Sequence, residues 1–172
     1  MKISIKHNYE FGYIILLVPS PIGLPVSISL QKEKLLLKSE FHITLINAEE
    51  IAKLIDQDNA SKIEAEIVTE FEDFIRENPL EDYKILPIFR FVQRKERKTI
   101  VALAKVPNLV NFFERLKKKY QTNIPLQPTH VTMYTLQPEV GIGILSNEEL
   151  ERDSKLIEIK ELKNLLFDKE IL

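Results

Sequence analysis

The chain carries the stretch Phe41-His42-Ile43-Thr44-Leu45 and repeats its pattern as Thr129-His130-Val131-Thr132-Met133. In both stretches a histidine stands two residues before a threonine, with apolar residues at the alternate positions. Because residues i and i+2 of an extended strand point to the same face, each histidine should project together with its threonine, leaving Ile43 and Val131 for the core. The chain has only three histidines, and a given one meets a threonine at this spacing by chance in roughly one case in twenty-five. The repeat is therefore the main functional signal of the sequence.

Length and composition indicate a single globular domain. The chain has 172 residues, of which 44% are hydrophobic and 29% charged, so we expect residues 1–172 to form one two-lobed domain with a sizeable core. The absence of cysteine excludes disulfide scaffolds, thiolate metal sites and cysteine nucleophiles. The apolar run at residues 13–18 is too short to span a membrane, and no leader-cleavage pattern follows it. We therefore expect a cytoplasmic monomer without a membrane partner.

Charge is unevenly distributed along the chain. The net charge of −2 gives no general attraction to nucleic acid, and no DNA partner is expected. Residues 49–82 carry twelve acidic and three basic side chains, whereas residues 84–120 carry eleven basic and two acidic ones. The basic segment either meets the phosphates of an RNA or forms a solvated hairpin tip and helix face. Charge runs usually do the latter.

The hydrophobic pattern predicts an α+β protein with largely antiparallel sheets. Capping-box signatures that begin at Asn47 and Ser61 predict the starts of two helices, and Pro79 ends the second. Residues 31–38 are compatible with a helix or a strand. Strands are predicted at residues 11–18, 26–30, 41–46, 83–92, 99–104, 129–135 and 156–159, and helices at residues 47–55, 61–77, 107–120 and 147–152. Each motif strand has a helix and another strand nearby, which suggests two related halves.

Paired histidines suit the cleavage of a phosphodiester. One imidazole can remove a proton from the attacking oxygen while the other protonates the oxygen that leaves. The hydroxyls of Thr44 and Thr132 can hydrogen-bond the phosphoryl oxygens, and their branched side chains hold these hydroxyls in few orientations. This chemistry requires no metal and no cofactor.

The two motifs resemble those of the 2H phosphoesterase superfamily, in which His-x-Thr/Ser motifs lie some eighty to ninety residues apart. Here His42 and His130 are 88 residues apart. The superfamily includes RNA 2′,3′-cyclic phosphodiesterases, also called 2′-5′ RNA ligases. The resemblance implies a duplicated fold in which antiparallel sheets form a central cleft. It also implies that His42 and His130 are the catalytic pair, that Thr44 and Thr132 bind phosphate, and that the substrate is a nucleotide or RNA 2′,3′-cyclic phosphate.

Three other residues have weaker signals. Tyr134 falls on the strand face of His130 and is expected to stack on a base of the substrate. Arg90 is a candidate to approach the phosphate from the predicted hairpin, although basic side chains on strands usually face solvent. His7 has polar neighbours and no threonine two positions on, so it is interpreted as structural.

Other functions remain open at this stage. No pair of histidines has the spacing of a zinc site, and no Gly-x-Ser-x-Gly elbow of a serine hydrolase is present. The main rival is a binding module of the same fold that holds a nucleotide or RNA end without cleaving it. A further alternative is an exonuclease that uses the same residues to trim RNA 3′ ends, which a deeper, more basic groove formed by residues 84–119 would support.

Overall fold

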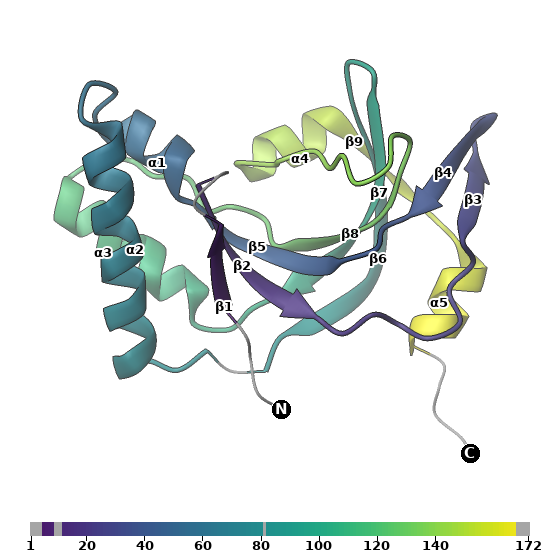
Figure 1. Cartoon of the computed structure of the whole chain (residues 1–172), viewed down its shortest axis with the longest axis horizontal. Coiled ribbons are helices and arrows are strands. Elements are labelled where there is room, and N and C mark those ends of the chain that lie inside the picture. Colours follow the sequence, from purple (N-terminus) through teal and green to yellow (C-terminus); the bar gives the residue numbers. More distant parts are fainter. Residues whose placement is uncertain (1–4, 9–11, 81, 168–172) are drawn as a thin grey trace.

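The computed structural model describes residues 5–8, 12–80 and 82–167 as an α+β fold (Figure 1). Phe11, with which the first strand was predicted to begin, and the side chain of His7 lie outside the described part. The strands are β1 (Ile5–Asn8), β2 (Tyr13–Val18), β3 (Ser27–Leu30), β4 (Glu33–Leu37), β5 (Phe41–Asn47), β6 (Lys84–Arg94), β7 (Arg97–Lys105), β8 (His130–Thr135) and β9 (Ser154–Ile157). The helices are α1 (Ala48–Ile55), α2 (Ala60–Glu77), α3 (Leu109–Tyr120), α4 (Asn147–Asp153) and α5 (Lys160–Phe167).

The strands form one antiparallel sheet with the order β1-β2-β5-β8-β7-β6-β9. Strands β3 and β4 form a hairpin beside this path, and β4 pairs with the last residues of β8. The two motif strands, β5 and β8, are neighbours in the middle of the sheet. Residues far apart in the sequence are therefore brought side by side at this point.

Each motif strand contains a β-bulge directly after its threonine. In β5 the extra residue is Leu45. The consecutive residues Ile14 and Ile15 of β2 pair with Ile46 and Thr44, so Leu45 between them has no partner in β2. In β8 the extra residue is Met133, which β7 skips in the same way. A bulge shifts the alternation of side chains between the two faces by one residue. The residues after Leu45 and Met133 therefore point to the faces opposite to those that a strict two-residue period predicts.

The main core lies between one face of the sheet and helices α1, α2 and α3, which Figure 1 shows grouped together. Helix α2 buries Ile67, Phe71 and Phe74 at helical spacing. The rings of Phe71 and Phe74 lie 5.1 and 5.3 Å, between centroids, from that of Phe112 on α3. Ile43 of the first motif strand belongs to the same buried cluster, so its neighbours in the strand turn to the other face.

A smaller core lies on that other face of the sheet. Ile142, Ile144 and Leu150 are buried against Val92 of β6 and Val101 of β7. These contacts hold the segment 139–145 and helix α4 over the sheet.

Most element predictions are confirmed. Residues 31–38, which the pattern left ambiguous, contain the strand β4. The predicted cap of α1 is present, since the Asn47 Oδ1 accepts a hydrogen bond from the Glu50 N–H at 3.2 Å. The α+β class with antiparallel pairing is confirmed, whereas the duplicated, two-lobed arrangement stays a prediction.

The predicted cap of α2 is wrong. The helix begins at Ala60, so Ser61 lies inside it, and Asn59 precedes it without a side-chain cap. The carboxylate of Asp56 accepts two backbone N–H bonds of the preceding turn, at 3.0 and 3.3 Å. This local turn, rather than the serine, leads the chain into the helix.

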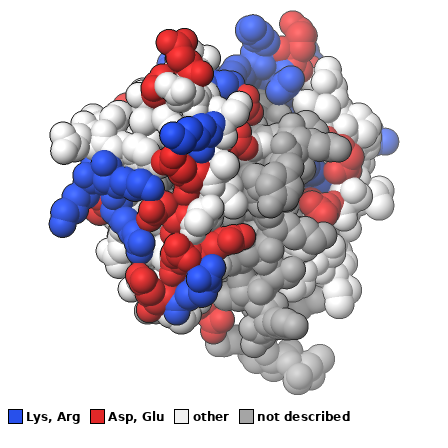
Figure 2. Space-filling model, turned by 60° about the vertical axis from the view of Figure 1, so that its left-hand side comes forward, with Lys and Arg blue, Asp and Glu red and all other residues white. Residues whose placement is uncertain are grey.

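The acidic and basic segments of the chain meet on one surface of the fold. Arg115 of α3 contacts Glu70 and Glu77 of α2, both at 3.1 Å, and Lys119 contacts Glu70 at 2.7 Å. Figure 2 shows Lys and Arg side chains interleaved with Asp and Glu on one face of the molecule. The uneven charge of the sequence therefore reflects, in this part, pairing between two helices. No helix in the described ranges is long and apolar enough to cross a membrane.

Candidate active site

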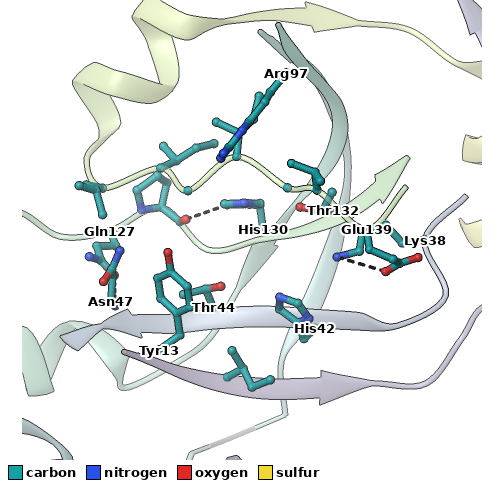
Figure 3. Close-up of a pocket in the computed structure, with 18 of the residues that line it drawn as sticks. Tyr13, Lys38, His42, Thr44, Asn47, Arg97, Gln127, His130, Thr132 and Glu139 are labelled. Carbon is teal, nitrogen blue, oxygen red and sulfur yellow. Dashed lines mark hydrogen bonds and ion pairs between the residues drawn. The ribbon is translucent and has the colours of Figure 1, made fainter. Parts of the chain in front are cut away.

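A cavity of about 360 Å³ lies between the sheet and the segment 139–145 (Figure 3). All four predicted motif side chains line it, two from β5 and two from β8. Its other lining residues are Tyr13, Ile15, Lys38, Glu40, Asn47, Arg97, Gln127, Pro128, Glu139, Val140, Gly141, Ile142, Gly143, Ile144 and Leu145.

The register of β5 and β8 explains why the motif side chains meet. Ile43 is paired with Val131, and both side chains are fully buried in the core. In an antiparallel pair this places His42 opposite Thr132 and Thr44 opposite His130, all on the cavity side. Side chains directly opposite have Cβ atoms about 5 Å apart, and diagonal ones about 7–8 Å apart. The two imidazoles, which are diagonal neighbours, are thus within reach of one phosphoryl group.

His130 is 8% exposed, and its Nδ1 lies 3.2 Å from the Pro128 carbonyl oxygen. Since a carbonyl only accepts, this Nδ1 carries the proton, and the neutral ring then has its lone pair on Nε2. Burial lowers the pKa of His130, the Pro128 hydrogen bond opposes the shift, and His42 lowers the pKa further. The electrostatic effect of His42 agrees with the closeness of the two rings.

His42 has a more polar environment. Its Nδ1 lies 3.4 Å from the Glu40 Oε1 without a hydrogen bond of good geometry. Burial and the Lys38 ammonium lower the pKa of His42, whereas the Glu40 carboxylate raises it. Lys38 itself lies 3.8 Å from the Glu139 carboxylate. A carboxylate beside His42 thus favours its charged form, whereas no carboxylate contributes to the pKa of His130.

The threonine hydroxyls are available to a ligand. Thr44 and Thr132 are half-buried and line the cavity. Within the described ranges neither hydroxyl has a hydrogen-bond partner. A hydroxyl that is fixed on a strand and lacks a protein partner can donate to a phosphoryl oxygen without breaking another bond.

The expectation for Tyr134 is wrong in this structure. Its side chain is 0% exposed, belongs to the main core and does not line the cavity. The bulge at Met133 turns Tyr134 to the face opposite to that of His130, and its hydroxyl donates to the Pro25 carbonyl oxygen at 3.0 Å. A buried tyrosine held in this way cannot stack on a base in the cavity.

Arg90 also lies away from the cavity. Its guanidinium donates two hydrogen bonds of 2.7 Å to the Glu151 carboxylate and a third, of 2.7 Å, to the Ser154 hydroxyl. Arg90 therefore links β6 to the α4–β9 segment. The hypothesis that Arg90 contacts the phosphate is not supported by this position.

Several polar residues of the cavity were missed by sequence reasoning. Arg97, at the start of β7, is directed into the cavity in Figure 3, and it has no ion pair within the described part of the chain. Lys38 and Gln127 reach the cavity from connections, where no periodicity predicts a direction. Asn47 was recognised only as a helix cap. For none of them does the sequence hold a signal beyond residue type.

Comparison with known proteins adds no assignment: no family model, no curated protein and no solved structure matches the chain. Among the described residues no group of three or more His, Cys, Asp or Glu side chains is placed to hold a metal ion. Metal independence stays a prediction.

Proposed function

We propose that the protein is a phosphodiesterase that hydrolyses 2′,3′-cyclic phosphates of nucleotides or RNA ends without a metal, as in the 2H phosphoesterase superfamily that its motifs resemble. One observation carries the proposal: His42, Thr44, His130 and Thr132 line one cavity. Two proton-transferring groups and two hydroxyls around one space are what an in-line displacement at phosphorus requires.

The environments of the histidines suggest how they share the work. His130, with its proton on Nδ1 and its pKa lowered by burial, presents a free Nε2 as the general base. His42, beside the Glu40 carboxylate, serves as the general acid once the phosphate anion favours its charged form. His130 takes a proton from a water molecule while the oxygen of that water forms a bond to phosphorus. The bond from phosphorus to one ribose oxygen breaks, and that oxygen takes a proton from His42.

The remaining polar groups act on the phosphoryl oxygens. The hydroxyls of Thr44 and Thr132 donate to the non-bridging oxygens, where negative charge gathers in the transition state. Arg97, which has no ion pair in the described part of the chain, is placed to add a charged donor.

One observation favours the second candidate, a module that binds a nucleotide or RNA end without cleaving it. The pKa values of both His42 and His130 are lowered, chiefly by burial, so the surroundings favour neutral imidazoles over the protonated acid that cleavage needs. The exonuclease alternative gains no such support, because many charges of the basic segment are engaged in ion pairs.

The test is hydrolysis of nucleoside 2′,3′-cyclic phosphates, with EDTA present, by the wild-type protein and by the His42→Ala and His130→Ala variants. We expect the wild type to be active with EDTA and each variant to lose about 10²- to 10⁴-fold in kcat. Thr69→Ala, on an exposed turn of α2 outside the cavity, is the matched control.

Binding without turnover by the wild type would favour the non-hydrolytic module. Equal rates for the wild type and both histidine variants would remove the proposed catalysts, and loss of activity on chelation would show that a metal takes part.

A further inference from the structure

The bulge in β5 adds a residue to the cavity that the His-x-Thr motif does not include. Thr44 and Asn47 are three positions apart, which on a regular strand would put them on opposite faces. Since Leu45 is the extra residue of the bulge, Leu45 and Ile46 both turn to the core and Asn47 returns to the cavity side. Bulges beside binding sites commonly redirect a side chain in this way.

Asn47 and Gln127 are joined, and their bonds fix which end of each amide is free. The Gln127 Oε1 accepts a hydrogen bond from the Asn47 backbone N–H at 2.9 Å. The Asn47 Oδ1 accepts one from the Glu50 N–H at 3.2 Å. Because a backbone N–H can only donate, both amide oxygens are assigned, and the NH₂ groups must lie on the other side.

The two NH₂ groups have no hydrogen-bond partner among the residues that the structure describes. Asn47 and Gln127 are each only 5% exposed, and neither amide nitrogen has a hydrogen bond to the described residues. Neither nitrogen is among the fully enclosed unpaired atoms of the described chain, and both residues line the cavity. Figure 3 shows the two side chains together at one end of the cavity, beside Tyr13. Donors that are buried without a partner are costly, which points to a ligand with acceptors.

This end of the cavity does not favour a second anion. Glu49 and Glu50 lie in the first turn of α1, just after Asn47, and together with burial, which is the largest cause, they raise the pKa of the neighbouring Tyr13. Lys53 contacts both carboxylates, at 2.6 and 2.9 Å, and balances one of the two charges. The Arg97 guanidinium, like Lys53, lowers the pKa of Tyr13, so the charges around this end nearly balance. Neutral donors in such an environment suit a neutral acceptor better than a phosphate.

We propose that Asn47 and Gln127 form a nucleobase subsite that selects cytosine over uracil and adenine at the cyclic phosphate end. This rests on the proposed function, since it takes the phosphate to lie at the histidines. The three residue steps from Thr44 to Asn47 span on the order of 10 Å of strand, a length comparable with that of a nucleoside. Two amide NH₂ groups donate and do not accept, so they match an edge with two adjacent acceptors.

Cytosine presents such an edge in its O2 and N3 atoms. In uracil a donor, the N3–H, stands between the two carbonyl oxygens, and the adenine edge places a donor amine beside its N1 acceptor. An unmatched donor is left unpaired with these bases, which lowers their affinity.

The test uses two substitutions that keep the structural hydrogen bonds. Asn47→Asp retains the oxygen that caps α1, and Gln127→Glu retains the oxygen that accepts the Asn47 N–H, while each replaces an NH₂ donor by an acceptor oxygen. Asn111→Asp, on the exposed side of α3 and outside the cavity, adds the same charge as a matched control.

The readout is the dissociation constant of cytidine, uridine and adenosine 3′-monophosphates and of base-free methyl riboside 3-phosphate, measured by calorimetry. We expect the wild type to bind the cytidine compound at least about tenfold more tightly than the uridine and adenosine ones. Each cavity variant should lower the ratio of cytidine to base-free affinity by about tenfold or more, and Asn111→Asp should not change it. The ratio cancels a general effect of added negative charge on phosphate binding.

Failure of the subsite and failure of the catalytic proposal have different signatures. If the wild type hydrolyses cyclic phosphates but binds all bases and the base-free compound alike, the subsite is wrong. A cytidine preference that survives both cavity variants also refutes it. If the preference is present and is lost in the variants while no cyclic phosphate is hydrolysed, the subsite stands and the protein is a binding module.

Discussion

Protonation of His130 should make the folded protein sensitive to mild acid. Because burial lowers the pKa of this imidazole in the folded state, the unfolded chain, with a histidine pKa near 6.5, binds a proton more readily. The free energy of unfolding is therefore fully present above pH ~6.5 and declines as the pH falls below that value. Acid destabilises the fold in this way because a base that is buried in its neutral form must become charged.

The size of the effect has an upper limit. Below the unfolded-state pKa, one histidine that stays neutral in the fold lowers the free energy of unfolding by about 1.4 kcal/mol per pH unit. Between pH 6.5 and pH 5.0 this limit is about 2 kcal/mol, or roughly 4–8 °C in Tm for a chain of this length.

The assay is thermal or urea unfolding of the wild type and of His130→Asn between pH 7.5 and pH 5.0. The asparagine amide can still donate to the Pro128 carbonyl but does not titrate in this range, so the other ionisable groups cancel in the comparison. We expect the free energy of unfolding of the variant to decrease less on acidification than that of the wild type. Parallel stability curves of the two proteins across this range would refute the reasoning, since His130 would then have the same pKa in both states.

Three further predictions follow from the structure. Tyr134→Phe should lower the free energy of unfolding by about 1 kcal/mol in urea titration, through loss of the bond to Pro25, and leave kcat/KM for cyclic phosphates unchanged; a large rise in KM would return Tyr134 to the site. Thr132→Val should lower kcat about 10²-fold in the same hydrolysis assay, and an unaltered kcat would exclude its hydroxyl from the transition state. Arg115→Met should lower the free energy of unfolding by less than about 1 kcal/mol, and by less still in 1 M salt, because its ion pairs with Glu70 and Glu77 are partly exposed; an effect independent of salt would indicate packing instead.

The sequence was most informative where a strand or helix is regular. The motif residues from His42 to Thr44 and from His130 to Thr132 follow the two-residue period, so their common face was predictable. Tyr134 was predicted wrongly by the same rule, because the bulge at Met133 shifts the alternation and nothing in the local sequence marks it. The position of Gln127 was equally hidden, since it lies in a connection without periodicity.

The sequence by itself determined the kinds of chemical group at the centre of this protein and the strands that carry them. Hydrophobic alternation is a local property, so it fixed which face His42, Thr44, His130 and Thr132 share within each strand. Only the tertiary structure decided that the two strands are neighbours, because pairing between residues 88 positions apart depends on the packing of the whole sheet. It also decided that Asn47 lines the cavity while Tyr134 lies in the core, because each bulge arises from the pairing of a motif strand with its neighbour.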